Sequence, residues 1–418
     1  MTSKNQSNEA YVWIWLPNEV KPVVGGLLTK FEDQLFFNYG KSYLNRPNAI
    51  AIYDPELPLK SGTQPLLPNM SMPSCIRDAS PDAWGRRVII NKKLGLKGRD
   101  AENSQLDELT YLLESGSDRI GALDFQLSPN NYVPRGPKTA TLDELMQSAE
   151  KVEAGVLLSP ELDQALYHGS SLGGARPKAF IESENGKLIA KFSSSTDVYN
   201  IVKAEFVAMR LAKIAGLDVA SVKLVKAAHK DVLLVERFDR KKTDEGWTRK
   251  AMVSALTLLE LDEMMARYAS YEDIAEIVRH RFTNPIETLK ELFARIVFNI
   301  LCGNTDDHAR NHAAFWDGHA LTLTPAYDIC PQNRSGNASS QAMIITQNKR
   351  MSRLDVCIQA ARFFLLSTDH AKQIIDHQVK TINKHWTMVC DEANLTETER
   401  AYFWKRQFLN PSIFEDSP

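Results

Sequence analysis

The chain has 418 residues, of which 43% are hydrophobic, so it is long enough for about two or three globular domains with apolar cores. Its 50 basic and 52 acidic residues give a formal net charge of -2, which excludes a chain-wide positive field that would attract nucleic acid or an anionic membrane. The five cysteines show no two-residue spacing of a zinc or dithiol motif, and the first apolar run is too short for a signal peptide or a membrane span, so we expect a cytosolic protein with reduced cysteines.

The first part of the chain carries alternating strand and helix signals. Aromatic and β-branched runs separated by Gly, Asn and Pro indicate short strands. Ser80 suits a helix cap and Pro81 suits the first helical position. The expected strands occupy residues 11–16, 35–39 and 122–127, and the expected helices residues 82–95 and 107–114. Residues 1–125 are therefore predicted to form a small β-rich α+β module.

A glycine-rich stretch follows an expected helix at residues 141–153. It has the sequence HGSSLGGARPKAFI from His168 to Ile181, and its backbone N–H groups could approach phosphates closely. Two strands, KAFIE and KLIAKF, come next and are joined by an Asn-Gly turn that favours a hairpin. A Walker loop would instead carry a Gly-Lys-Ser or Gly-Lys-Thr tail entering a helix. The pattern favours a kinase-like phosphate loop over a Walker loop, and a plain surface loop stays open.

Lys191 lies in the second strand of that hairpin among apolar neighbours. A lysine there needs an opposite charge, either a phosphate or Glu205 on the expected helix 202–215, unless it faces solvent. The run VLLVERFDR at residues 232–240 indicates a buried strand with polar residues at its end. In a two-lobed kinase such a strand leads into the hinge, where backbone groups of Glu236 to Phe238 would meet the adenine.

Beyond Arg249 the sequence predicts a helical region. Leucine and alanine dominate residues 251–261, and Pro285 begins an apolar helix that Gly303 ends. A short hairpin at residues 313–323 interrupts the helices. The remaining expected helices occupy residues 271–280 and at least three segments between 354 and 408.

The segment NTDDHARN, residues 304–311, and the run TPAYDI contain the polar residues that phosphoryl transfer requires. One carboxylate, Asp306, would orient the attacking hydroxyl, while the Asn311 amide oxygen and the Asp328 carboxylate would hold magnesium against the nucleotide phosphates. Two alternatives stay open at this point. The residues could form only a turn after a helix. The cluster could also be a hydrolytic metal site, whose ligands would be Asp306, Asp307, His308 and His312.

The glycine-rich loop, Lys191, VERFDR, NTDDHARN and TPAYDI occur in this order. Together they resemble the HipA-type serine/threonine kinases, the toxins of bacterial HipBA toxin-antitoxin pairs. The runs VVGGLL, FNYGKSYL, SPDAWGRR and DRIGALDF are similar to that family's N-terminal module, so the resemblance covers about residues 10–400. It implies an α+β, two-lobed protein-kinase-like fold. Its implied parts are the N-terminal module at 1–125, a kinase N-lobe at 126–245 and an all-helical C-lobe at 246–418.

The resemblance also implies roles for individual residues, with ATP and Mg²⁺ as cofactors. Asp306 is similar to the catalytic Asp, and Asn311 and Asp328 are similar to the magnesium ligands. Lys191 is similar to the phosphate-contacting lysine, whereas Asp307 and His312 are expected to be structural. The implied nucleotide-contacting residues are Gly173, Gly174, Ala175, Arg176, Pro177, Lys178, Lys191, Glu236, Arg237, Phe238, His308, Tyr327 and Asp328.

Ser171, or its neighbour Ser170, resembles the serine that these kinases autophosphorylate. That event ejects the loop in the family, and the added negative charge would repel a bound nucleotide. The resemblance implies a helix-turn-helix antitoxin as partner, DNA contact through that complex, and an aminoacyl-tRNA synthetase as a candidate substrate in bacterial persistence. The basic residues Lys349, Arg350 and Arg353 could touch DNA or form an ordinary solvated face. A small-molecule phosphotransferase and a catalytically silent, antitoxin-bound corepressor are the alternatives.

Overall fold

The computed structural model describes residues 7–94, 105–136, 141–153, 156, 176–183, 186–194, 197–334, 336 and 338–415. These residues form two compact units. The first unit takes its described residues from Met1–Thr196, Val225–Val253 and Phe315–His319. The second unit takes them from Asp197–Leu224, Ser254–Ala314 and Ala320–Pro418. The predicted division into three parts at residues 125 and 245 stays a prediction.

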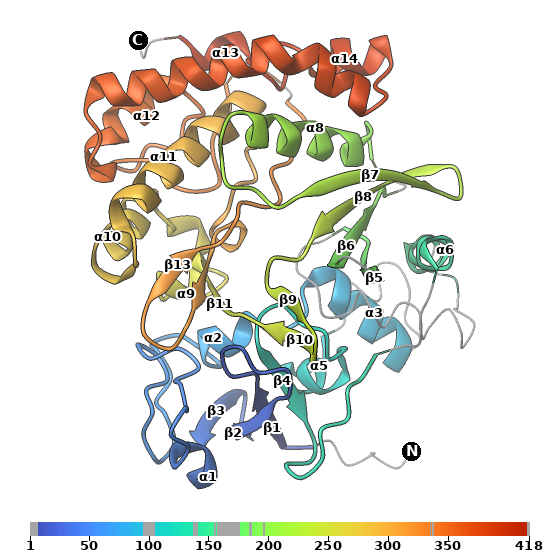
Figure 1. The fold of residues 1–418 in the computed structure, drawn as a ribbon, viewed down its shortest axis with the longest axis vertical. Helices are drawn as coiled ribbons and strands as arrows, with labels where there is room; N and C mark the ends of the chain where they lie inside the picture. The colour runs from blue at the N-terminus through green and yellow to red at the C-terminus, as the bar shows by residue number, and fades with distance from the viewer. Residues whose placement is uncertain are drawn as a thin grey trace. The chain divides into compact units, whose positions relative to one another are not determined.

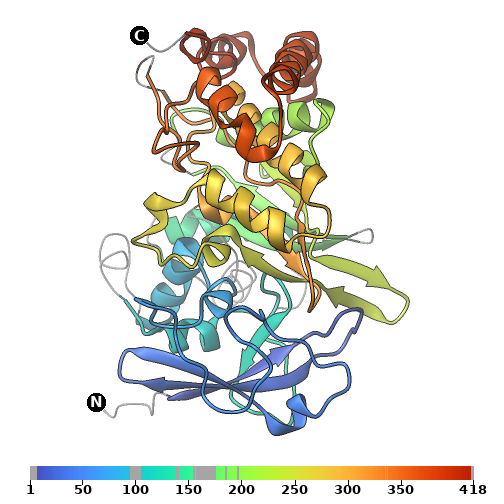
Figure 2. The ribbon, with the colours of Figure 1, turned by 90° about the vertical axis from the view of Figure 1, so that its left-hand side faces the viewer.

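An antiparallel sheet with the strand order β3-β2-β1-β4 forms the N-terminal part of the first unit (Figure 2). Its strands are β1 (Glu9–Ile14), β2 (Val23–Phe31), β3 (Gln34–Tyr39) and β4 (Leu123–Gln126). Val12, Phe37 and Phe125 are fully buried, which suits strands rich in aromatic and β-branched residues. A β-carbon at Gly26 would lie 2.6 Å from the Phe37 ring, so only glycine fits there. The three predicted strands of this module are confirmed.

Four helices complete this N-terminal part. They are α1 (Lys41–Leu44), α2 (Ser74–Arg77), α3 (Ala83–Leu94) and α5 (Glu108–Glu114). The helix predicted at 107–114 is confirmed as α5, and the side chain of Asp107 caps it by accepting the N–H of Thr110. The predicted start of α3 is wrong, because Asp82 Oδ1 accepts the N–H of Gly85 at 3.0 Å and the helix begins after it. The Ser80 hydroxyl, which was expected to cap, has no hydrogen-bond partner within the described residues.

A second antiparallel sheet with the order β5-β6-β8-β7 follows. Its strands are β5 (Lys178–Ser183), β6 (Gly186–Phe192), β7 (Val222–Ala227) and β8 (Lys230–Glu236). The predicted hairpin of β5 and β6 is confirmed by their register, which pairs Ser183 with Gly186. Helix α6 (Leu142–Glu153) and α3 pack on this sheet. Their shared apolar core contains Trp84, Val88, Leu145, Met146, Ala149, Val152, Ala179, Ala190, Phe192, Ala227 and Val232.

The stretch after β8 differs from the prediction. The strand expected to run to Arg240 ends at Glu236, and β9 (Arg240–Thr243) then pairs with β10 (Gly246–Arg249). The expected helix at 251–261 is only the short α9 (Ala255–Leu258), preceded by β11 (Ala251–Ser254). The side chain of Ser254 caps α9 by accepting the Thr257 N–H, which explains why the helix cannot begin earlier.

The second unit is built around α11 (Pro285–Cys302), whose apolar residues are almost all buried. Figure 1 shows α13 running along α8, α11 and α12, with which it packs. The predicted starts at Tyr271 and Pro285 and the three helices after residue 354 are confirmed. The other elements are α8 (Ile201–Ile214), η1 (Ala266–Tyr268), α10 (Tyr271–Arg281), η2 (Ala309–Asn311), α12 (Leu354–Ala360), η3 (Ala361–Phe364), α13 (Thr368–Glu392), α14 (Glu397–Phe403) and η4 (Pro411–Ile413).

The C-terminal part was predicted to be all-helical, and this prediction is wrong. Strands β12 (Ala313–Trp316) and β13 (Leu321–Leu323) form there and belong to a sheet with the order β11-β12-β13. The short hairpin predicted between residues 313 and 323 is thereby confirmed. All five cysteines are buried thiols, as the composition predicted. Within the described part of the chain, no helix has both the length and the apolar character that a membrane crossing requires.

Candidate active site

The polar segment after α11 begins at a helix end that the sequence specifies. Gly303 caps α11 in the left-handed conformation, with φ of 73°. Asn304 then returns two hydrogen bonds to Asn299, through its backbone N–H at 2.8 Å and through its side-chain Nδ2 at 3.0 Å. Because both asparagines are buried, these contacts fix the direction in which the chain leaves the helix. The residues that follow are the predicted catalytic ones.

The carboxylate of Asp306 is exposed and lies near the carboxylate of Asp328, and both residues belong to the second unit. The pKa of Asp306 is raised, first because surrounding protein atoms remove part of its solvation, and also because Asp328 repels its negative charge. His308 acts in the opposite direction and lowers this pKa. The two acidic groups are therefore close enough to repel each other, and a bound cation would relieve that repulsion.

Asn311 is buried and oriented by the segment itself. Its Nδ2 donates to the backbone carbonyl of Asp306 at 3.1 Å, and its backbone N–H donates to the carbonyl of His308 at 2.8 Å. With the amide nitrogen used in this way, the amide oxygen is the atom left to face a cation. Amide and carboxylate oxygens are ligands that Mg²⁺ accepts. Asn311 and Asp328 therefore fit the predicted magnesium site.

Asp328 has an unusual backbone, with φ of 60° in the left-handed region. Aspartate tolerates this region better than most residues, and such strained positions are frequent in functional sites. Its neighbour Tyr327 donates its hydroxyl to the carbonyl of Arg310 at 2.7 Å. This bond joins the TPAYDI run to the turn that carries Asn311. The structure thus brings together the three residues predicted to orient the acceptor and hold the metal.

Asp307 and His312 form a buried network with Tyr271 behind this segment. His312 Nε2 lies 2.9 Å from Asp307 Oδ1 and 3.0 Å from the Tyr271 hydroxyl, which also donates to Asp307 Oδ2. All three side chains are almost completely buried. The expectation that Asp307 and His312 are structural agrees with these contacts, although the sequence did not predict Tyr271 as their partner.

The alternative hydrolytic metal site is not formed. Among the residues that the structure describes, no three His, Cys, Asp or Glu side chains come together in a way that could hold a metal ion. The reason is that Asp307 and His312 point into the network with Tyr271, whereas Asp306 is exposed. His308, predicted to lie beside the nucleotide, is half-buried, and its Nδ1 is a buried atom with no hydrogen-bond partner within the described residues.

The other predicted nucleotide contacts belong to the first unit. Lys191 is half-buried on β6, where its neighbours across the sheet are Lys178 on β5 and Leu233 on β8. Lys178 is buried and lies 3.7 Å from Asp82 Oδ2, so its charge is offset by this ion pair. Glu205 belongs to the second unit, and its pairing with Lys191 stays a prediction.

The serine-glycine loop lies mostly outside the described residues. Ser170, Ser171, Gly173, Gly174 and Ala175 are in this group, so their predicted roles stay predictions. Arg176 and Pro177 are described and directly precede β5. The carbonyl of Pro177 accepts the N–H of Phe192 at 3.0 Å, which fastens the end of the loop to the strand that carries Lys191.

The predicted hinge differs from the expectation at Arg237. Its backbone N–H donates to the carbonyl of Lys187 at 2.9 Å, and its guanidinium is wholly buried among protein acceptors. Neither group is therefore able to meet an adenine. Glu236 is exposed at the end of β8, while the ring of Phe238 stacks edge-on against Phe315 with centroids 5.9 Å apart. Glu236, Phe238 and the backbone carbonyl of Arg237 remain the predicted nucleotide contacts of this stretch.

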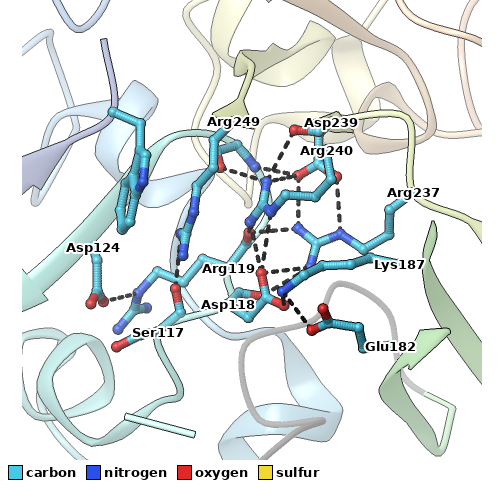
Figure 3. Close-up of polar contacts among 12 residues, drawn as sticks. Ser117, Asp118, Arg119, Asp124, Glu182, Lys187, Arg237, Asp239, Arg240 and Arg249 are labelled. Carbon is cyan, nitrogen blue, oxygen red and sulfur yellow. Dashed lines mark hydrogen bonds and ion pairs between the residues drawn. The ribbon is translucent and has the colours of Figure 1, made fainter. Parts of the chain in front are cut away.

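A buried network of charges surrounds Arg237 and was not predicted (Figure 3). Arg237 and Arg240 both contact Asp118 and Asp239, and Arg119 pairs with Asp124 at 2.9 Å. The only signal in the sequence is the alternation of charged and apolar residues in SDRIGALD and ERFDR. Such alternation also describes an ordinary half-exposed strand, so the sequence alone does not reveal burial of the charges.

The pKa values of this network follow from burial and ion pairing. Burial by itself would raise the pKa of Asp239, but Arg237 and Arg240 outweigh it and lower that pKa to about 2. Burial would likewise raise the pKa of Asp124, but Arg119 and Arg135 outweigh it and lower that pKa to about 2. These carboxylates are therefore ionised near neutral pH, as the surrounding guanidinium groups require.

Comparisons with known proteins agree with the geometry. A family model described as the HipA N-terminal domain matches residues 19–126, and one described as the HipA-like C-terminal domain matches residues 170–386. Y4mE of Sinorhizobium fredii, named a candidate kinase, is 25% identical over 336 residues, which cover 73% of this chain and 74% of that protein. The serine/threonine-protein kinase toxin HipA of Shewanella oneidensis is 27% identical over 271 residues, which cover 54% of this chain and 60% of the toxin.

One solved structure shares the fold over nearly the whole length. A chain of the complex of HipA, HipB and operator DNA from Shewanella oneidensis MR-1 superimposes with a TM-score of 0.67 and 17% identity. The alignment covers 98% of this chain and 100% of that chain. The mixture of helices and sheets agrees with it, and the expected two-lobed, kinase-like α+β fold is confirmed.

Proposed function

Because this chain belongs to the HipA family, we propose that it is an ATP-dependent protein serine/threonine kinase of the HipA toxin type. The observation that carries the proposal is the arrangement after α11. There the Asp306 carboxylate lies within electrostatic range of Asp328, and Asn311 is tied to the backbone of Asp306 at 3.1 Å. A carboxylate beside two oxygen ligands is what phosphoryl transfer requires of a protein.

In this proposal each residue has a separate role. Asp306 accepts a hydrogen bond from the attacking serine or threonine hydroxyl and orients it toward the γ-phosphate. Asn311 and Asp328 would hold Mg²⁺, which neutralises charge on the nucleotide phosphates when it is bound. Lys191 would contact those phosphates from β6, and His308 and Tyr327 would flank the nucleotide. The protein thereby contributes positioning and charge rather than a covalent intermediate.

We also propose that the serine-glycine loop is the first acceptor. Ser171, or alternatively Ser170, would receive the γ-phosphate of ATP as its hydroxyl proton is lost, leaving ADP. The fastening of Pro177 to β6 supports this role, because it holds the end of the loop beside the strand of Lys191. Phosphorylation would add up to about two negative charges where the nucleotide phosphates already lie. Repulsion between them would then favour release of the nucleotide.

The proposed partner is a helix-turn-helix antitoxin, and DNA would be reached through that complex. The shared fold with a HipA that was solved with HipB and operator DNA supports this part of the proposal. An aminoacyl-tRNA synthetase is the proposed class of protein substrate, through the family resemblance, and the proposed site of action is the cytosol. Phosphoproteomics after induction, compared with an Asp306→Asn variant, identifies the substrate that is modified in cells.

The function is tested with the purified chain, magnesium and ATP labelled on the γ-phosphate. We expect label in the protein, and peptide mapping should place it on Ser171 or Ser170. The double variant Ser170→Ala, Ser171→Ala is the matched control, since it should bind ATP and take up no label. Nucleotide binding with label passing only to small-molecule acceptors would favour the small-molecule phosphotransferase. Failure to bind nucleotide at all would favour the silent corepressor.

A further inference from the structure

The end of strand β8 is held by residues from the N-terminal part of the first unit (Figure 3). Arg237, which directly follows β8, donates to the carbonyl of Arg119 at 2.7 Å and lies 3.0 Å from Asp118 Oδ1. Arg240 lies 3.0 Å from the same oxygen of Asp118. Both arginines also contact Asp239 Oδ2, at 2.8 and 2.7 Å. One carboxylate from the N-terminal part therefore meets both guanidinium groups.

The two arginines and Asp239 lie where water is largely excluded, whereas Asp118 is 29% exposed and closes the network from its edge. The side chains of Arg237 and Arg240 are 0% and 1% exposed, and that of Asp239 is 3% exposed. Buried charges require partners in specific directions, because no water can replace a lost one. Gly121 strengthens the arrangement, since its N–H donates to Asp239 Oδ2 at 2.9 Å and its carbonyl accepts from Arg240 at 3.0 Å. The position of Arg237 is thus strongly constrained.

Asp118 also contacts the neighbouring strand. Its Oδ2 accepts from Lys187 Nζ at 2.8 Å, and Lys187 lies on β6. Strand β6 pairs with β8, with Lys191 opposite Leu233. Asp118 therefore contacts two places at once. Its Oδ2 binds Lys187 on β6, the strand that also carries Lys191, and its Oδ1 binds Arg237, which directly follows β8.

We propose that Asp118 is a positioning residue for nucleotide binding, which sets the register and direction of β6 and the end of β8 from the N-terminal module. This inference rests on the proposed function, because it assigns a consequence to the predicted contacts of Lys191, Glu236 and Phe238. Asp118 would act through residues such as Lys187, Arg237 and Arg240 and would not itself touch the nucleotide. The N-terminal module is then part of the nucleotide site rather than a separate appendage.

The effect of Asp118 should fall on binding and not on the chemical step. Removing its charge takes the 2.8 Å ion pair from Lys187, which keeps Glu182 at 3.5 Å, and takes one of the two carboxylate partners from Arg237. The segment of Asp306, Asn311 and Asp328 belongs to the second unit and makes none of these contacts. A loss of nucleotide contacts that are equally strong in the ground state and in the transition state raises KM for ATP with kcat unchanged. This split separates a positioning role from a general loss of folded protein, which would lower the apparent kcat.

Asp124 provides a matched control in the same network. Its carboxylate is more buried than that of Asp118, and it pairs with Arg119 at 2.9 Å and Arg135 at 2.8 Å. Its hydrogen bonds to Arg119, Gln126, Tyr132 and Arg135 all stay within the N-terminal part and involve neither β6 nor the end of β8. The guanidinium of Arg119 also donates to the carbonyls of Ala79 and Leu112, so its side chain keeps these two anchors when Asp124 is changed. Asp124→Asn should lower stability without moving the nucleotide contacts.

The test measures KM for ATP, kcat and the unfolding midpoint for the full-length wild type, Asp118→Asn, Asp118→Glu and Asp124→Asn. We expect Asp118→Asn to raise KM for ATP by about tenfold to hundredfold, as small misplacements of substrate-positioning groups do. Its kcat at saturating ATP should stay near that of the wild type. Asp118→Glu, which keeps the charge, should restore much of the affinity. Asp124→Asn should lower the unfolding midpoint and keep the KM of the wild type.

The outcomes separate the inference from the proposed function. An unchanged KM in Asp118→Asn overturns the inference, as does an equal rise in KM in Asp124→Asn. If Asp118→Asn does not fold, Lys187→Met replaces it, because this variant releases only β6 and should still raise KM. A wild type that binds no ATP overturns the proposed function, and the inference falls with it. A wild type that binds ATP, with no response at Asp118 or Lys187, overturns the inference alone.

Discussion

At the scale of single residues, the candidate active site depends on hydrogen bonds that orient polar side chains. Asn311 gives its amide nitrogen to the carbonyl of Asp306, and Tyr327 gives its hydroxyl to the carbonyl of Arg310. Together these bonds hold the two segments that carry the predicted magnesium ligands. The role of each ligand can be tested separately from the fold, because asparagine can replace aspartate with little change in shape.

Asp328→Asn should keep the fold but weaken the response to magnesium. Asparagine tolerates the left-handed φ of 60° at this position, so the unfolding free energy should change by less than about 1 kcal/mol. Loss of one carboxylate should raise the magnesium concentration that gives half-maximal phosphate transfer. Titration of activity with magnesium measures this shift. An unchanged magnesium requirement would show that Asp328 is not a ligand.

Tyr271→Phe tests the buried network behind the catalytic segment. The hydroxyl that contacts both Asp307 and His312 is removed, so two buried polar groups each lose a partner. We expect a loss of about 1–3 kcal/mol in the free energy of unfolding, measured with urea. Tyr268→Phe is the control, since Tyr268 is 49% exposed and should change little. Equal effects of the two substitutions would contradict the structural role of the network.

The sequence predicts a chemistry for these residues but does not predict the side chains that they contact. The Asp and Asn of NTDDHARN and the Asp of TPAYDI could be assigned because phosphoryl transfer requires those side chains in that order. Tyr271 could not be assigned to Asp307, because the two residues lie 36 positions apart and nothing local links them. Arg237 was assigned to the hinge by its position alone, and only the structure shows its N–H bound to Lys187.

At the scale of helices and strands, local rules predicted boundaries well where one capping residue dominates. Pro285 and Gly303 mark the two ends of one predicted helix, and the structure has both ends there. The start of α3 failed because Ser80 and Asp82 are both good caps, and the sequence does not say which one reaches the free N–H groups. Strand β11 was missed because its four residues precede a helix directly and share its apolar character.

The helix-ending glycines Gly303 and Gly216 give a matched pair of substitutions. Both have positive φ, 73° and 90°, so alanine at either position should cost about 1–2 kcal/mol of unfolding free energy. At Gly303 a β-carbon would also lie 2.8 Å from the carbonyl oxygen of Gln407, whereas at Gly216 nothing lies within 4 Å. Gly303→Ala should therefore be the more destabilising in urea unfolding. Equal losses would argue against the close approach of Gln407.

At the scale of the whole molecule, the least predictable feature is the charge network of the first unit. Asp118 and Arg237 lie 119 positions apart, and both belong to motifs that look like ordinary strand ends. A sequence shows the number of charges but not which of them folding removes from water. The family resemblance includes both motifs but gives no indication that they meet.

The network should make stability depend on acid pH. Asp239 has a folded pKa of about 2, below the ordinary value of 3.8, so folding favours its ionised form. Its contribution is complete above about pH 4 and is lost as the pH falls toward 2. Asp239→Asn should destabilise the protein at neutral pH by about 3–5 kcal/mol and flatten the acid dependence of unfolding. An identical acid dependence in the variant would exclude Asp239 as the source.

The most direct test of the central claim compares wild type with Asp306→Asn at saturating ATP and magnesium. Calorimetry should give closely similar affinities for ATP, because in the proposed site Asp306 orients the acceptor hydroxyl and does not hold the nucleotide. Phosphate transfer to protein should fall by about 10²- to 10⁴-fold, the contribution typical of a group that accepts the proton of the attacking hydroxyl. A variant that binds ATP and transfers phosphate at the wild-type rate would contradict the assignment of this segment as a kinase active site.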